Sequence, residues 1–287
     1  MLNALVLAAA IDVAQICAKV ERVKVPAVAQ EDYDICAGDG YCLVDIAETF
    51  ANGNGVPRDY DVATFLLCRA ADGIAPAESE GMIEHIEAMR SGETDEPFVL
   101  CEHITSGIGQ SRCASISYSE RMPELEARRD AMRAASATPR LFGALDQAAQ
   151  TYRDAEVERV GELSRGGTAH AALVTEAEMD EMQHYVDALT AWTTRRAAAA
   201  TAAELATADK ALNTNYRAEI AAWAEFSDEP GRYEGLCRDA QRAWIKYRDA
   251  FAAFYVAKWK GSASDEVLRR EIVTELTRTR ARELGDE

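Results

Sequence analysis

Basic residues, aromatic residues and long apolar runs are all scarce in this chain of 287 residues. Only 31 Lys and Arg stand against 49 Asp and Glu, and the resulting net charge of −18 repels phosphate backbones and anionic lipid surfaces. No stretch of 18 or more apolar residues occurs, so no transmembrane segment is predicted. The composition disfavours a nucleic-acid-binding protein and favours soluble or basic partners.

Residues typical of strands are also few. Aromatic residues make up 7% of the chain, and β-branched runs of strand length are rare. Alanine, glutamate, arginine and leucine dominate the last two thirds, and all four favour helices. The sequence therefore predicts an all-α protein.

The polar segment 91–97 separates a glycine-rich and cysteine-rich first part from two helical parts. We therefore predict a helical module over residues 1–97, a helical unit over 98–195 and a second helical unit over 196–287. The apolar run 2–10, followed by Asp12, is similar to a secretory signal but lacks a basic start. Residues 1–14 are thus either a signal-like segment or a first helix.

The two helical units are related by an internal repeat with an offset of 95 residues. The triplet Tyr152-Arg153-Asp154 falls on Tyr247-Arg248-Asp249. Further matches at this offset are Gly166 with Gly261, Leu173 with Leu268, Glu176 with Glu271 and Leu189 with Leu284. The shared triplet and glycine favour duplication over chance identity in alanine-rich helices. The predicted fold is a helical-hairpin repeat module followed by two duplicated helical-bundle units.

Apolar residues recur every three or four positions in the second unit and predict one long helix that faces a core. The members of this stripe are Leu236, Ala240, Trp244, Tyr247, Phe251, Phe254 or Tyr255, and Trp259. A following helix is predicted to begin near Ser264, a residue type that caps helices. We also hypothesise an ion pair between Arg248 and Asp209.

Seven cysteines occur without a CxxC pair, which disfavours a redox motif or a zinc knuckle and favours disulfides in an oxidising compartment. The residues that we expect in disulfides are Cys36, Cys42, Cys68, Cys101 and Cys113. Because seven is odd, one thiol remains free or pairs outside the chain. Cys17 and Cys237 are the two for which pairing is least expected.

Motifs that carry catalysis are missing from the sequence. It contains no GxSxG, P-loop, GxGxxG or HExxH string. Glu176, Asp180 and His184 are spaced four apart on one predicted helix face, but an exposed acidic face explains this spacing as well as a cation site does. We predict no catalytic, cofactor-binding or metal-binding residues, and hence no enzyme.

A helical hairpin is predicted between residues 42 and 73. Ile46 and Phe50 lie on one face of a first helix, Gly53 and Gly55 allow a tight turn, and Asp59 opens a second helix. The residues of the second helix that face the first are Ala63, Leu66, Leu67 and Ala70. The segment resembles a Sel-one-like repeat, a relative of tetratricopeptide repeats, and residues 78–90 resemble part of a second unit.

From Cys101 onward the chain resembles the lysozyme-inhibitor LprI N-terminal-like family of exported bacterial proteins. The residues that match the family's motifs are Asp209, Leu212, Asn213 and Tyr216, then Gln241, Trp244, Tyr247, Arg248 and Asp249, and finally Leu276, Thr277, Arg280 and Leu284. The family's two early cysteines match Cys101 and Cys113, so the resemblance implies that these two pair. The family usually has a cysteine soon after its Arg-Asp pair, where this chain has Ala250, Phe251 and Ala252.

The resemblance implies an exported, non-catalytic protein of the bacterial envelope or periplasm that binds a protein partner, by family implication a basic lysozyme. The alternative is a periplasmic structural or adaptor protein that holds another protein in the concave face of the helical module, around residues 41–90. The sequence identifies no partner-binding residues and no oligomeric state.

Overall fold

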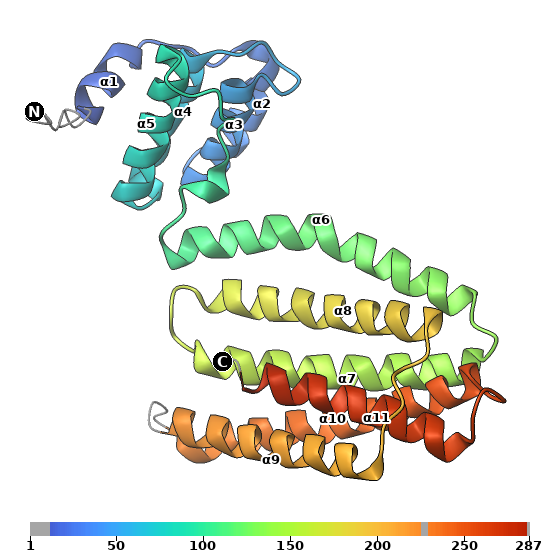
Figure 1. Cartoon of the computed structure of the whole chain (residues 1–287). Helices are drawn as coiled ribbons and strands as arrows, with labels where there is room; N and C mark the ends of the chain where they lie inside the picture. The colour runs from blue at the N-terminus through green and yellow to red at the C-terminus, as the bar shows by residue number, and fades with distance from the viewer. Residues whose placement is uncertain (1–11, 225–228, 286–287) are drawn as a thin grey trace, which may run out of the picture. The chain divides into compact units, whose positions relative to one another are not determined.

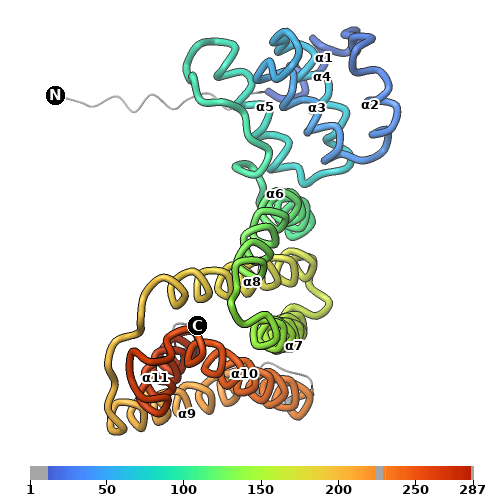
Figure 2. The backbone as a smooth tube through the Cα atoms, turned by 90° about the vertical axis from the view of Figure 1, so that its right-hand side faces the viewer, coloured from blue at the N-terminus to red at the C-terminus, as the bar shows by residue number. Residues whose placement is uncertain are grey.

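The computed structural model describes residues 12–224 and 229–285, and all regular structure in these residues is helical. This confirms the predicted all-α fold. The chain forms two compact units, Met1–Cys113 and Ala114–Glu287, each with its own core (Figures 1 and 2). Among the described residues, no helix is both long and apolar enough to span a bilayer. Most of the signal-like segment, residues 1–11, lies outside the described residues.

The first unit consists of short helices. They are α1 (Val13–Val20), η1 (Ala27–Ala29), α2 (Gln30–Ile35), α3 (Gly40–Asn52), α4 (Tyr60–Ala70), η2 (Ala71–Gly73), α5 (Pro76–Ser91), η3 (Leu100–Glu102) and the first turns of α6 (Gly107–Ala134).

Helices α3 and α4 form the predicted hairpin. The Asp59 carboxylate accepts hydrogen bonds from the backbone N–H groups of Asp61 and Val62 and so caps the start of α4. Gly53 ends α3 with a φ of 74°, a conformation that glycine adopts without strain. Ile46 and Phe50 are buried in the core of this unit.

Three disulfides join Cys17 to Cys68, Cys36 to Cys42 and Cys101 to Cys113. The five expected residues are therefore paired, and the pairing implied for Cys101 and Cys113 is present. The expectation for Cys17 was wrong, because α1 packs on α4 and brings together two cysteines 51 residues apart. Cys237 carries a buried free thiol.

The predicted boundary at residue 97 lies inside the first unit. The Asn52 side chain donates to the carbonyl of Phe98 and accepts from its N–H, and Phe98 and Leu100 are buried. Further on, the buried Glu78 carboxylate accepts from the Tyr41 hydroxyl and from the N–H groups of Thr105 and Ser106. These contacts attach residues 98–106 to α3 and α5.

The second unit contains the rest of α6 and five further long helices. These are α7 (Pro139–Leu163), α8 (His170–Thr194), α9 (Ala202–Ala224), α10 (Pro230–Lys258) and α11 (Asp265–Glu283). Both α6 and α8 begin 95 residues before their counterparts α9 and α11. Gly166 and Gly261, which match at this offset, both have positive φ in the loops that follow α7 and α10. The helix order thus repeats as the sequence comparison predicts.

The two predicted helical-bundle units share one core. Tyr152 of α7 stacks on its counterpart Tyr247 of α10, with ring centroids 5.7 Å apart. Phe142 packs edge-on against Phe254 on one side of this pair, and Arg159 reaches the far end of α10 on the other. The two helices are therefore antiparallel and cross near the stacked tyrosines.

The predicted aromatic stripe of α10 faces this core, and Trp244, Tyr247, Phe251, Phe254 and Tyr255 are all buried. The predicted start of the last helix is also confirmed: the Ser264 hydroxyl accepts from the N–H of Val267 and caps α11.

Candidate functional site

The two ends of the α7–α10 interface carry different chemistry. At the first end the core is aromatic, with Phe251, Phe254 and Tyr185 buried. The 95-residue offset places Glu156 on Phe251, Arg159 on Phe254 and Arg280 on Tyr185. At the second end, therefore, three charged side chains occupy the positions that aromatic rings fill at the first, and all three are also buried.

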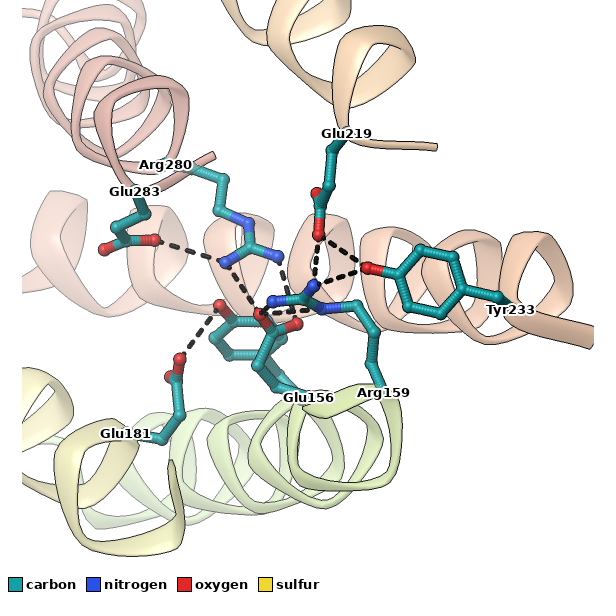
Figure 3. Close-up of polar contacts among 8 residues, drawn as sticks. Glu156, Arg159, Glu181, Glu219, Tyr233, Arg280 and Glu283 are labelled. Atoms are coloured by element: carbon teal, nitrogen blue, oxygen red, sulfur yellow. Dashed lines mark hydrogen bonds and ion pairs between the residues drawn. The ribbon is translucent and has the colours of Figure 1, made fainter. Parts of the chain in front are cut away.

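The charged residues form a connected network (Figure 3). Glu156 accepts from Arg159 Nη2 at 2.7 Å through one carboxylate oxygen and from Arg280 Nη2 at 3.0 Å through the other. Arg159 also pairs with Glu219 of α9, and its Nη1 donates to the Tyr233 hydroxyl of α10 at 3.0 Å. This hydroxyl donates to Glu219 at 3.0 Å. The two guanidiniums are thus held by carboxylates from α7 and α9.

The network fixes its own charge state. Burial alone would raise the pKa of Glu156, but the guanidiniums of Arg280 and Arg159 outweigh it and lower the pKa to about 2. Burial likewise acts against the charged form of Arg280, yet Tyr152 and Glu156 hold its pKa well above the usual range. Two ionised guanidiniums therefore lie within the core of a helical bundle.

Two further carboxylates lie at the outer edge of the network. Glu283 accepts from Arg280 Nη1 at 3.3 Å, and Glu181 of α8 accepts from the Tyr152 hydroxyl at 3.5 Å. Burial and the nearby Glu156 carboxylate raise the pKa of Glu181 to about 8. Glu181 thus lacks a paired cation among the described residues, and the Arg280 Nε, although buried, has no hydrogen-bond acceptor there.

A pocket of about 380 Å³ opens outward from this edge, and we call it the acidic pocket. Its walls come from α7, α8 and α11 and consist of Glu156, Arg159, Val160, Leu173, Glu176, Ala177, Asp180, Glu181, His184, Arg280 and Glu283. Five carboxyl groups face two guanidiniums, and even with Glu181 protonated the walls carry excess negative charge.

A smaller cavity of about 60 Å³ lies beside the acidic pocket and shares four of its residues, namely Glu181, His184, Arg280 and Glu283. Its other walls include Trp244, Tyr247 and Leu276. Four residues of the predicted family motifs, from α10 and α11, therefore meet at this one cavity.

The other motif residues have structural roles. Leu212 and Leu284 belong to the core, Tyr216 packs against it, and the buried Thr277 hydroxyl donates to the carbonyl of Val273. The Asn213 amide donates to the carbonyl of Asp209, and the buried Gln241 Oε1 has no hydrogen-bond donor among the described residues.

The hypothesis that Arg248 pairs with Asp209 was wrong. Arg248 lies over the ring of Trp244, 5.3 Å from its centroid, and pairs with the adjacent Asp249 at 3.1 Å. The spacing of four residues along α10 brings the guanidinium onto its own helix's tryptophan rather than across to α9.

The three residues with metal-like spacing, Glu176, Asp180 and His184, all line the acidic pocket. In the part of the chain that the structure describes, no three His, Cys, Asp or Glu side chains are arranged to hold a metal ion.

The part of the chain that forms α9, α10 and α11 is similar to a known protein family. Residues 187–284 match the family model of the lysozyme inhibitor LprI. This match confirms the LprI resemblance for the last part of α8 through α11, and its description is that of an inhibitor rather than of an enzyme. No curated protein and no solved structure matches the chain.

Sequence reasoning missed Glu156, Arg159, Glu181 and Glu219, because each reads by itself as an ordinary charged residue of an exposed helix face. The sequence did contain a signal for two of them, in the 95-residue offset that relates the two repeats. Glu156 and Arg159 fall there on Phe251 and Phe254, residues that the apolar stripe already placed in a core.

Proposed function

We propose that this protein is an exported, non-catalytic protein that binds and inhibits a lysozyme in the bacterial cell envelope. The observation that carries the proposal is the LprI match over residues 187–284. Trp244, Tyr247, Leu276 and Arg280 from this segment meet beside the acidic pocket. The acidic pocket is accordingly the proposed contact surface.

Charge supports this assignment. The chain has a net charge of −18, and the pocket walls add a local excess of carboxylates. A basic enzyme would be attracted over a distance of about a Debye length, which is roughly 10 Å at 0.1 M salt. Association with such a partner should therefore be fast and sensitive to salt.

Export is supported by the three disulfides, since disulfides persist in oxidising compartments such as the periplasm and are rare in the cytosol.

The test is a lysozyme turbidity assay with the purified, oxidised protein at low and high salt. We expect inhibition at low salt that weakens as salt rises. An Arg280→Lys variant, which keeps the charge but loses the planar guanidinium, should inhibit less well. Absence of inhibition at either salt, with the helical content intact by circular dichroism, would contradict the proposal.

A second candidate function is favoured by a groove in the first unit. Val28 and Ile35 are largely exposed there, and they line a pocket of about 350 Å³ together with Ile46, Phe50 and Val56. Exposed apolar side chains around a groove are typical of protein-binding surfaces. An adaptor that uses this Sel-one-like module to hold another envelope protein becomes the leading function if lysozyme is not inhibited.

A further inference from the structure

In the second unit, the segment between α8 and α9 carries an arginine that contacts the C-terminal repeat, which consists of α9, α10 and α11. Arg196 pairs with the buried Glu271 of α11 through two contacts, one of them from Nε at 2.8 Å. Its Nη1 donates to the carbonyl of Ser262 at 3.3 Å. The irregular residues 195–201 thus place a guanidinium on a carboxylate of the C-terminal repeat.

Backbone contacts hold the same segment in place. The N–H of Ala197 donates to the Tyr255 hydroxyl at 2.7 Å, and Arg270 Nε donates to the carbonyl of Ala200 at 2.7 Å. Both alanines are buried. The C-terminal repeat therefore binds a short stretch of non-helical chain as well as an arginine side chain.

The acidic pocket lies in the N-terminal repeat, which consists of α6, α7 and α8, at the place that corresponds to the site of Arg196 in the C-terminal repeat. At the 95-residue offset, Glu176 of the pocket corresponds to Glu271, and Leu173 corresponds to Leu268. Leu268 is 0% exposed and Glu271 is 1% exposed, whereas Leu173 is 41% exposed. Glu176 is exposed and has no ion-pair partner among the described residues. The same binding surface is thus covered in one repeat and uncovered in the other.

The chain segment that corresponds to residues 195–201 is residues 100–106, and other contacts bind it. The Cys101–Cys113 disulfide and the hydrogen bonds from Thr105 and Ser106 to Glu78 hold it within the first unit. The pocket itself is lined by residues of the second unit only.

The charges of the pocket select a cation. Arg159 and Arg280 are already paired with Glu156, Glu219 and Glu283. This leaves Glu176 and Asp180 as carboxylates of the pocket with no ion-pair partner among the described residues. Because Asp180 follows Glu176 by one turn of α8, a guanidinium that reaches Glu176 also lies close to Asp180.

We propose that the acidic pocket binds an arginine-bearing, non-helical segment of a protein partner, and that Glu176 pairs with the guanidinium as Glu271 pairs with Arg196. The exposed Leu173 then packs under the backbone of that segment. This inference rests on the proposed function only for the identity of the partner, since the pocket recognises an arginine whatever protein carries it.

The test uses the full chain and a capped peptide with the sequence of residues 195–201, Arg-Arg-Ala-Ala-Ala-Ala-Thr. Binding is measured by isothermal titration calorimetry or by NMR shifts of α8 residues. We expect saturable binding that becomes about twofold to fivefold weaker in Glu176→Gln, in keeping with an exposed ion pair. The matched control is Glu120→Gln, which removes one exposed carboxylate of α6 outside the pocket.

A peptide in which glutamine replaces both arginines should not bind. The inference is overturned if the arginine peptide does not bind the wild type, or if Glu176→Gln and Glu120→Gln weaken binding equally, since the latter result would indicate general charge attraction. Lysozyme inhibition without peptide binding would leave the proposed function in place and remove this inference. Peptide binding without lysozyme inhibition would do the reverse.

Discussion

The two ends of the α7–α10 interface are built from the same pair of helices, related by the same repeat, yet one end is aromatic and the other is ionic. At the aromatic end Phe254 packs edge-on against both Phe142 and Phe251. At the ionic end Glu156, Arg159 and Arg280 occupy the positions that match Phe251, Phe254 and Tyr185. Aromatic rings fill the core at one end of the interface. The need to fill a core therefore does not by itself explain why charged side chains are buried at the other end.

Energetics sharpen the contrast. Desolvating an ion costs several kcal/mol, and well-packed apolar residues in place of a buried ion pair are often as stabilising or more so. Aromatic packing carries no such cost and contributes about 0.5–1.5 kcal/mol per ring pair beyond its buried area. The ionic end lies against the acidic pocket, for which we propose a role in binding a cationic partner.

The largest effect is expected for Arg280→Met, which removes one of the two guanidiniums from Glu156. Glu156 and Glu219 would then share the single guanidinium of Arg159, and this excess of buried negative charge should lower the free energy of unfolding by about 3 kcal/mol near neutral pH. In the wild type the pKa of Glu156 is lowered, so its stabilisation is present above the pKa of an unfolded glutamate and is lost only as pH falls toward 2. Without Arg280 the carboxyl of Glu156 takes up a proton at a higher pH than in the wild type, so the penalty of the variant should shrink in acid as its Glu156 becomes protonated.

Denaturant unfolding of Arg280→Met and of the wild type, at about pH 7 and about pH 4, measures this difference. A penalty that is small at both pH values would mean that the ionic network contributes little to the fold.

Phe251→Leu probes the aromatic end with a smaller expected effect. The loss of ring volume and of edge contacts should lower the free energy of unfolding by about 1–2 kcal/mol. Because no ionisable group is removed, the loss should be the same across the pH range in which Arg280→Met varies. A marked pH dependence, seen in the same denaturant titrations, would show that the two ends are not energetically separate.

Glu181→Gln gives the smallest effect, and its sign is opposite. The raised pKa of Glu181 means that the folded state holds this proton more tightly than the unfolded state, so stability falls as pH rises from about 4.5 to about 8. The variant lacks this loss and should gain about 1 kcal/mol over the wild type above pH ~8, after allowance for solvent screening, with no gain near pH ~5. Thermal melts at both pH values test this, and an equal gain at both would assign the effect to packing.

Much of the fold could be predicted from the sequence because its signals are local. The cap at Asp59, the turn glycine Gly53 and the apolar stripe of α10 each act within a few residues, and each was found where predicted. The offset of Tyr247 from Tyr152 also predicted the repeat. It could not predict that these two rings stack, because chain order does not determine whether duplicated helices pack on their own repeat or on each other.

The candidate site was harder to predict, because it depends on contacts between residues far apart in the chain. Arg280 was found as a motif residue, but its partner Glu156 lies 124 positions earlier. The pairing of Cys17 could not be predicted for the same reason, since only the packing of α1 on α4 brings it to Cys68. The sequence shows the spacing of Glu176 and its match to Glu271. Only the structure shows that Arg196 pairs with the Glu271 carboxylate.

The buried thiol of Cys237 affects whether the chain keeps its three disulfides correctly paired. Burial raises the pKa of this thiol to about 11, so almost none of it is thiolate at neutral pH. Since only a thiolate attacks a disulfide, the folded second unit keeps its odd cysteine from exchanging with the three bridges of the first. An oxidising compartment can then host seven cysteines in one chain without scrambling, provided that the second unit folds before its thiol meets a bridge.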